Sequence, residues 1–121
     1  LAREARMSRR GKNGARILQP ESVRLMRQNQ LDEARLADFA KLNKRGYGYG
    51  LGVRTMIDPA SCGAKSPVGE FGWDGAAGAY VLIDTTNRLA CFMGMQVLDN
   101  DRAFREFHPA VRDTVYEILG L

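Results

Sequence analysis

The chain has 121 residues, of which 45% are hydrophobic and 26% are charged, and its formal net charge is +4. This length suits one domain, and the composition is that of a folded globular protein rather than a disordered one. No run of about 18 apolar residues occurs, so the sequence predicts no membrane-spanning helix. It begins Leu-Ala-Arg-Glu, without Met or an apolar signal core, so we predict no secretion signal and expect a trimmed chain or a fragment.

The charge is unevenly distributed along the chain. Residues 1–54 hold 13 Lys and Arg against 5 Asp and Glu, whereas residues 55–121 hold 5 against 9. A basic half of this kind is found in proteins that bind nucleic acid or anionic surfaces, but a solvated helical surface is the more common cause. Aromatic residues are not interleaved with the basic ones, and no zinc, helix-turn-helix or RNP-type signature occurs. We therefore expect no nucleic-acid partner.

Residues 1–45 are expected to be mainly helical. Residues 1–10 have helical composition and end at the Gly-rich stretch 11–14, after which Ala15–Leu18 is expected to be extended. Pro20 and Glu21 then favour a helix start, and the apolar spacing within residues 31–42 predicts a second helix.

Residues 46–97 have strand character. Residues 46–57 alternate Gly with larger side chains and predict one strand whose Gly face lets another backbone or a ligand approach. Asp58–Pro67 is expected to be a loop. Further strands are predicted at 68–74, 77–84 and 88–97, and their short connections favour antiparallel pairing. The last two are apolar at nearly every position, so we expect cover on both of their faces.

Residues 98–121 predict a helical segment that packs on the sheet. Its expected apolar stripe has spacings of three and four, and Pro109 is expected to kink or restart it. The stripe consists of Phe104, Phe107, Val111, Val115, Ile118 and Leu119. The chain as a whole is thus predicted to be an α+β domain, with an antiparallel sheet flanked by helices.

Few residues suggest catalysis. None of the four Ser residues lies in Gly-x-Ser-x-Gly or is followed three positions later by Lys. The single histidine, His108, is expected to be a packing or surface residue. Cys62 and Cys91 fit no metal-binding spacing, so no metal site or cofactor is predicted, and whether they form a disulfide stays open. Asp74, between Trp73 and Gly75, is either a residue at the rim of a pocket or a turn former at a strand end.

The order of segments resembles a known family. The stretches Gly14–Met26, Gly48–Val53 and Gly69–Asp84, followed by an apolar strand and a helix, are similar to the C-terminal part of the serine β-lactamase-like family. This family includes class C β-lactamases, esterases, D-amino-acid peptidases and penicillin-binding proteins. The resemblance covers nearly the whole chain and implies the C-terminal part of a β-lactamase/transpeptidase-like fold.

The resemblance also implies roles for particular residues. The third family motif matches Trp73-Asp74-Gly75, and the backbone N–H of Ala76 would then be one of two oxyanion-hole donors. The family nucleophile motif, Ser-x-x-Lys, is absent from this chain, as is the second motif. The implied function is therefore part of a serine hydrolase acting on ester, amide or β-lactam substrates, inactive alone and completed by a missing N-terminal part.

A second interpretation is a non-catalytic binding or assembly module of the same fold. Apolar sheet surface left open by a missing half would favour a self-associated copy as the partner. The family resemblance leaves both the bacterial cytoplasm and the periplasm open as the compartment.

Overall fold

The computed structural model describes residues 13–121, so the helix predicted over residues 1–10 lies outside the described range. The described chain has an α+β fold, as predicted. The elements in chain order are α2 (Pro20–Arg27), α3 (Glu33–Phe39), the π-helical turn η1 (Ala40–Lys44), β1 (Tyr47–Tyr49), β2 (Arg54–Met56), α4 (Pro59–Cys62), β3 (Phe71–Gly72), β4 (Tyr80–Asp84), β5 (Leu89–Met93), the π-helical turn η2 (Ala103–Phe107) and α5 (His108–Leu119).

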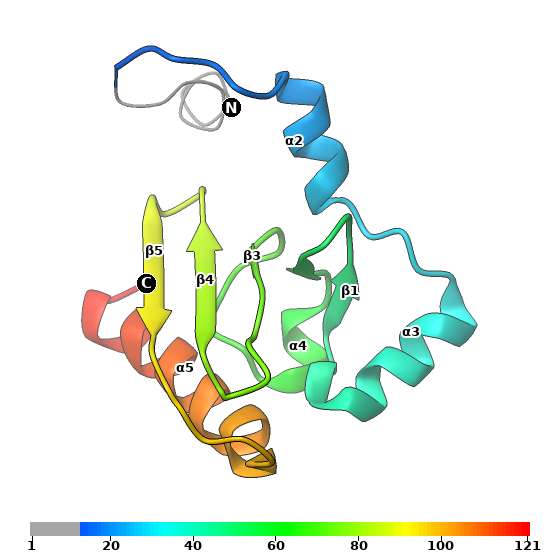
Figure 1. Cartoon of the computed structure of the whole chain (residues 1–121), viewed down its shortest axis with the longest axis vertical. Coiled ribbons are helices and arrows are strands. Elements are labelled where there is room, and N and C mark those ends of the chain that lie inside the picture. The colour runs from blue at the N-terminus through cyan, green and yellow to red at the C-terminus, as the bar shows by residue number, and fades with distance from the viewer. Residues whose placement is uncertain (1–12) are drawn as a thin grey trace.

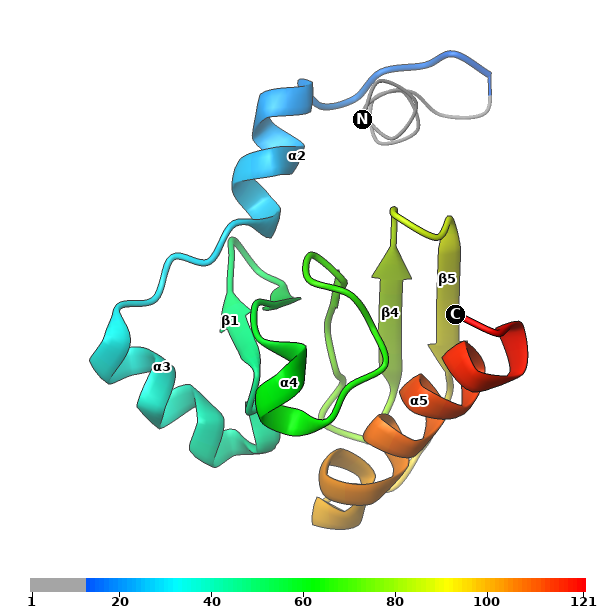
Figure 2. The same ribbon diagram turned by 180° about the vertical axis from the view of Figure 1, so that it is seen from behind.

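The five strands form one antiparallel sheet in sequence order, β1-β2-β3-β4-β5 (Figure 1). Seen from the other side, α4 and α5 lie across one face of the sheet (Figure 2). Between β4 and β5 the register runs from Tyr80 opposite Met93 to Asp84 opposite Leu89. Asp84 also closes the turn between them, because its Oδ1 accepts the N–H groups of Thr86 and Asn87 at 2.8 and 3.1 Å.

Local sequence signals explain most of the helix ends. Asp32 caps α3 by accepting the N–H of Arg35 at 2.9 Å. Pro20 and Pro109 lie in the first turns of α2 and α5, where a missing N–H costs no helical hydrogen bond. Pro109 therefore begins a new helix after η2, which is one of the two outcomes expected for it. Gly120 ends α5 in the left-handed conformation, with φ of 69°.

Residues 46–57 form a hairpin, and the prediction of one continuous strand was wrong. The Gly-rich stretch turns between Tyr49 and Arg54, and Gly50 N–H donates to Val53 O at 2.8 Å to close the turn. The expected close approach at its glycines is confirmed, because a Cβ on Gly50 would lie 1.9 Å from Met26 O. The neighbouring backbone here is the last turn of α2 and the residue that follows it, Gln28.

Two other local expectations were also wrong. Asp58–Pro67 contains the short helix α4, which Asp58 caps by accepting the N–H of Ser61 at 3.3 Å. The stretch Ala15–Leu18 is not part of any strand, and Ile17 within it is 96% exposed.

The core lies between α5 and the inner face of β4 and β5. Tyr80, Leu82 and Tyr116 are buried there, and partly buried residues of β5 and α5 pack around them. Both Cys62 and Cys91 are free thiols. The residues of α5 that face the sheet are His108, Arg112 and Tyr116, spaced by four. The predicted apolar stripe was thus displaced, because Ile118 is 77% exposed.

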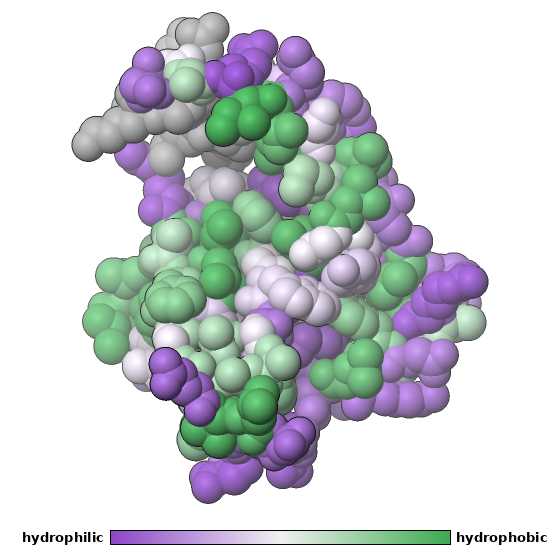
Figure 3. Space-filling view, viewed as in Figure 1, coloured by the Kyte–Doolittle hydropathy of each residue, from purple (hydrophilic) through white to green (hydrophobic). Residues whose placement is uncertain are grey.

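The opposite face of β4 and β5 carries no helix among residues 13–121, so the second cover expected for these strands is not found in the described range. Phe92 in the middle of β5 is 72% exposed. Figure 3 shows hydrophobic residues gathered over these two strands on this face. No helix in the described range is long and apolar enough to cross a membrane.

Candidate functional site

The predicted site residues form the connection between β3 and β4. Trp73 and Asp74 extend β3, since Val81 N–H donates to Trp73 O at 3.0 Å and Asp74 bridges to Tyr80. The chain then reverses in a tight turn at Gly75–Gly78, where Gly78 N–H donates to Gly75 O at 2.9 Å. Antiparallel strands with a short connection were expected within residues 68–84, and this part of the prediction is confirmed.

The turn presents Ala76 to the outside. Ala76 is exposed, and within residues 13–121 no hydrogen bond occupies its N–H. Gly78 shapes the turn because its φ is +90°, and a Cβ there would lie 2.5 Å from the Met95 sulfur. The backbone at Ala76 is therefore accessible to a ligand, as an oxyanion donor must be.

Trp73 points to the face of the sheet opposite α5, because side chains alternate along a strand. Its ring meets Tyr49 edge-on, with centroids 5.3 Å apart, and Tyr49 meets Phe39 of α3 in the same way at 5.7 Å. These three rings, with Leu31 and Leu42, line a groove of about 490 Å³. The groove thus begins at the residue that precedes Asp74 and the turn.

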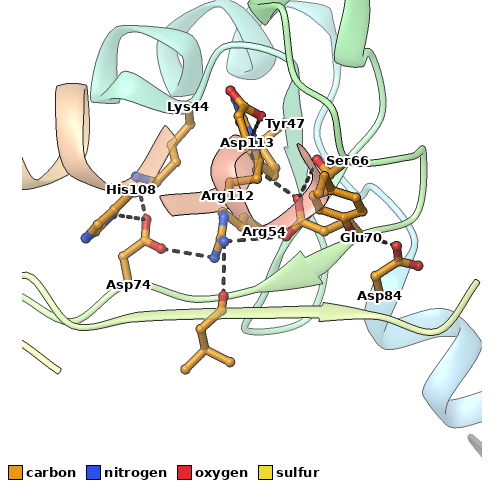
Figure 4. A network of polar contacts seen from close by, with 12 residues as sticks. Lys44, Tyr47, Arg54, Ser66, Glu70, Asp74, Asp84, His108, Arg112 and Asp113 are labelled. Atoms are coloured by element: carbon orange, nitrogen blue, oxygen red, sulfur yellow. Dashed lines mark hydrogen bonds and ion pairs between the residues drawn. The ribbon is translucent and has the colours of Figure 1, made fainter. Parts of the chain in front are cut away.

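Asp74 points to the α5 side and is held by two cations. Its Oδ2 lies 2.6 Å from Lys44 Nζ, and its Oδ1 lies 3.0 Å from Arg54 Nη1 (Figure 4). The Asp74 side chain is 5% exposed. It is therefore more than a turn former, and it also lines a cavity on this face. The sequence left open whether Asp74 lies at the rim of a pocket or forms a turn at a strand end. In the structure Asp74 lines the cavity, and the turn follows it directly.

Arg54 extends these contacts into the interior. Its guanidinium lies between two aromatic rings, 5.1 Å from the centroid of Tyr47 and 4.7 Å from that of Tyr80. Its Nη2 donates to Val81 O at 3.0 Å and lies 3.5 Å from Oε1 of Glu70. Arg54 thereby links Asp74 to a second buried carboxylate.

Glu70 is fully buried and accepts two side-chain hydroxyls. Tyr47 OH donates to its Oε2 at 2.8 Å, and Ser66 Oγ donates to the same oxygen at 3.3 Å. Burial raises the pKa of Glu70 and raises the pKa of Tyr47 to about 12. Arg112 Nη1 donates to Tyr47 OH at 3.3 Å, which connects this cluster to α5. We call the connected set Lys44, Tyr47, Arg54, Ser66, Glu70, Asp74, Arg112 and Asp113 the buried polar network.

His108 lies beside the buried polar network and is a packing residue, which is one of the two roles expected for it. Its Nε2 donates to Gly78 O at 2.8 Å, and its Nδ1 is 3.8 Å from Oδ2 of Asp74. Burial lowers the pKa of His108, because the cation loses hydration in this position. The ring also stacks against Tyr80, at a centroid distance of 4.8 Å. His108 therefore fixes the β3–β4 turn to the start of α5.

Within the described range the site lacks a solvent-accessible nucleophile paired with a base, since Ser66 and Glu70 are both buried. Ser66 is held by Glu70, and the Cys62 thiol contacts Pro59 O at 3.6 Å rather than His108. No group of three or more His, Cys, Asp or Glu side chains in residues 13–121 is arranged to hold a metal ion. The arrangement presents a backbone donor and an apolar groove on one face, and a buried ionic cluster on the other.

The sequence prediction missed Lys44, Arg54, Glu70 and Arg112. Two signals were available for them. Arg54 and Glu70 are charged residues at positions of predicted strands where the neighbours are apolar or small, and such residues are buried only with a partner of opposite charge. The spacing of four from His108 to Arg112 to Tyr116 also marks the face of α5 that turns inward.

Comparison with known proteins gives a partial match. No protein-family model matches the chain. The uncharacterized protein MT1414 of Mycobacterium tuberculosis strain CDC 1551 and protein Rv1367c of strain H37Rv are each 38% identical to it over 73 residues, which is 56% of this chain. The match spans about 18% of the length of these relatives. The chain thus resembles one segment of much longer proteins.

Proposed function

We propose that this chain supplies one wall of the active site of a serine hydrolase of the β-lactamase-like type. In this proposal the Ala76 N–H is an oxyanion donor, and Trp73, Asp74 and Gly75 are the third-motif segment beside it. A Ser-x-x-Lys segment outside these 121 residues would supply the nucleophile. The substrates would be esters, amides or β-lactams that form an acyl-enzyme intermediate.

The observation that carries the proposal is the geometry of the β3–β4 turn. Its N–H at Ala76 is exposed and unoccupied within the described range, and the strand that leads into it begins an apolar groove at Trp73. An oxyanion donor needs an open backbone N–H, and an acyl substrate needs an apolar surface next to it. The much greater length of the matched relatives supports a nucleophile located elsewhere in a longer chain.

The Asp74 side chain has a positioning role in this proposal. The carboxylate is turned away from the groove and held by Lys44 and Arg54. It therefore fixes the backbone of the third-motif segment rather than touching the substrate. Trp73 is the side chain of this segment that faces the groove, and it would contact the acyl or leaving group.

The test compares the 121-residue chain with a longer chain that adds a segment containing Ser-x-x-Lys. A chromogenic ester and a chromogenic cephalosporin serve as substrates. We expect no turnover by the short chain and turnover by the longer one. Robust turnover by the 121 residues alone would overturn the proposal.

Ala76→Pro in the longer chain tests the donor directly. Ala76 is the second residue of the turn, where Pro is well accepted, so this change removes the N–H and leaves the turn in place. Loss of one oxyanion donor is expected to lower kcat by roughly 100- to 1000-fold. Ala76→Gly keeps the N–H and is the matched control. Equal rates for the Pro and Gly variants would show that Ala76 is no oxyanion donor.

We also propose, as a second function, a non-catalytic module that self-associates through β5. The outer edge of β1 is occupied, since Gln30 N–H donates to Tyr49 O at 2.8 Å and Asn29 Oδ1 accepts the Tyr49 N–H at 3.1 Å. In the described range no backbone hydrogen bond satisfies the outer edge of β5, and this strand has no charged residue or Pro. Such an edge is suited to pairing with a second copy. A compact monomer at all concentrations in sedimentation velocity would exclude this function.

A further inference from the structure

A cavity of about 440 Å³ lies on the α5 side of the sheet, apart from the turn at Ala76. It is bounded by η1, by the sheet, and by η2 with the start of α5. Four arginines line it, and Asp74 is the one carboxylate among its lining residues. The four are Arg45, Arg54, Arg105 and Arg112.

Three of these arginines have carboxylate partners, and one does not. Arg105 contacts Asp101 at 2.5 Å and Arg112 contacts Asp113 at 2.8 Å, while Arg54 contacts Asp74. Arg45 forms no ion pair with any residue in the range 13–121 and is exposed. The cavity wall therefore holds one uncompensated positive charge, which a singly charged anion would balance.

Three buried polar atoms on the cavity wall lack a hydrogen-bond partner within the described range, and one of them is Oδ1 of Asp74. Arg54 Nη1 contacts Asp74 at 3.0 Å but without hydrogen-bond geometry, and its side chain is 1% exposed. His108 Nδ1 makes no hydrogen bond, and its side chain is 5% exposed. Unsatisfied buried polar groups are costly, and they are commonly found where a ligand or water binds.

The rest of the wall is apolar or aromatic. Ala40, Tyr80, Phe104 and Pro109 line the same space. A simple inorganic ion would leave these surfaces uncovered, whereas an organic acid would place its hydrocarbon part against them. The combination of guanidinium groups with an apolar wall is typical of sites for small carboxylates.

We propose that this cavity binds a small organic carboxylate, with its charged group between Arg45 and Arg54 and its apolar part against Phe104 and Pro109. The site is separate from the proposed oxyanion donor, because Asp74 and Trp73 face opposite sides of the sheet. Binding here would stabilise the junction of η1 and α5, since both elements contribute side chains to it.

The single histidine of the chain makes the test direct. The groups that face its ring are Asp74, Lys44, Arg54, Tyr80 and Phe104. An anion in the cavity would favour the protonated ring, so binding would raise the pKa of His108 by linkage. The experiment follows the His108 imidazole signals by NMR while benzoate is added to the 121-residue chain, with chloride holding the ionic strength constant.

We expect saturable shifts of the His108 signals with benzoate and a higher pKa in its presence. Arg45→Ala is expected to weaken benzoate binding by about tenfold or more, because it removes a charge-assisted contact. Arg24→Ala, an exposed arginine on α2, is the control and should bind benzoate like the parent chain. Circular dichroism checks that each variant is folded.

Three results would overturn this inference. One is a shift that never saturates and that chloride reproduces. Another is unchanged affinity in Arg45→Ala. The third is tighter binding of inorganic phosphate than of benzoate in the same titration. That result would show a site for a doubly charged oxyanion rather than for a carboxylate.

Discussion

The ammonium group of Lys44 lies 2.6 Å from the carboxylate of Asp74, and both side chains are at least nine-tenths buried. This pair joins the end of η1 to the end of β3, two segments 30 positions apart in the chain. It holds Asp74, the residue immediately before the β3–β4 turn. The position of Ala76 thus depends on a contact made well away from the turn itself.

Lys44→Met is expected to destabilise the chain by about 3 kcal/mol, because it leaves part of the buried Asp74 charge uncompensated. Urea unfolding followed by circular dichroism measures the change. Lys44→Met combined with Asp74→Asn should recover part of that loss, since the buried charge is gone. A double variant as unstable as the sum of the two single variants would show that the pair is not coupled.

The Arg112–Asp113 pair predicts a pH dependence. Burial acts to raise the pKa of Asp113, but hydrogen bonds from Arg112 and from the Lys65 N–H outweigh it, so the net pKa is lowered. A carboxylate with a lowered folded-state pKa stabilises the fold above its unfolded pKa of about 4 and loses this contribution as pH falls. Asp113→Asn should therefore destabilise at pH 7 and have a smaller effect below pH 4.

Urea unfolding of Asp113→Asn and the parent chain at several pH values checks this expectation. Asp38→Asn is the control, because Asp38 is an exposed carboxylate in an ion pair on α3 and its loss should change stability little at any pH. A destabilisation by Asp113→Asn that is constant from pH 7 to pH 3 would contradict the assignment.

Gly72 lies in β3 directly against the backbone of β4. A Cβ at this position would lie 1.9 Å from Val81 O, so Gly72→Ala must displace β4 or β3. We expect a loss of stability on the order of 3 kcal/mol, the upper end of the cost of overpacking. Gly94→Ala is the matched control, because its Cβ would meet nothing nearer than 3.6 Å. Thermal unfolding of both variants tests this expectation. Equal unfolding midpoints would show that position 72 is not packed closely against Val81.

Phe92 lies on β5, the edge strand through which self-association is proposed, so a charge at this position tests that proposal. Phe92→Lys should lower self-association at high concentration, because charged residues on an edge strand disfavour pairing between copies. Stability should change by less than about 0.5 kcal/mol, as is usual for surface substitutions. Ile118→Lys changes an equally exposed apolar residue on α5 and should leave association unchanged. Sedimentation velocity of the three chains distinguishes these outcomes.

The sequence was sufficient to predict the features that depend on neighbouring residues. Asp84 and the residues after it indicate the β4–β5 turn, and Pro109 indicates a helix start, because both effects act within one turn of chain. The hairpin at residues 46–57 was missed because the alternation of Gly and Tyr is compatible both with one continuous strand and with a hairpin. The decisive contact there is the approach of Met26, which lies more than twenty positions away.

The candidate site was predictable only in part, for a similar reason. Composition indicated only a backbone that something can approach, from the small residues after Trp73, and the roles of Trp73 to Ala76 were implied by the family resemblance. The partners of Asp74 come from η1 and β2, and sequence spacing gives no measure of that proximity. The role of the Ala76 N–H stays a prediction that the turn supports and that the Pro substitution tests.

Each strand of this sheet pairs with the strand that follows it in the chain, so the sheet can form by closing short loops one after another. Arrangements dominated by such local pairings fold quickly compared with sheets built from distant segments. The contact of Tyr47 with Arg112, by contrast, spans 65 positions and requires α5. A growing chain would therefore assemble its strands and the ion pairs among residues 44–74 first, and these charges would be covered only when α5 emerges.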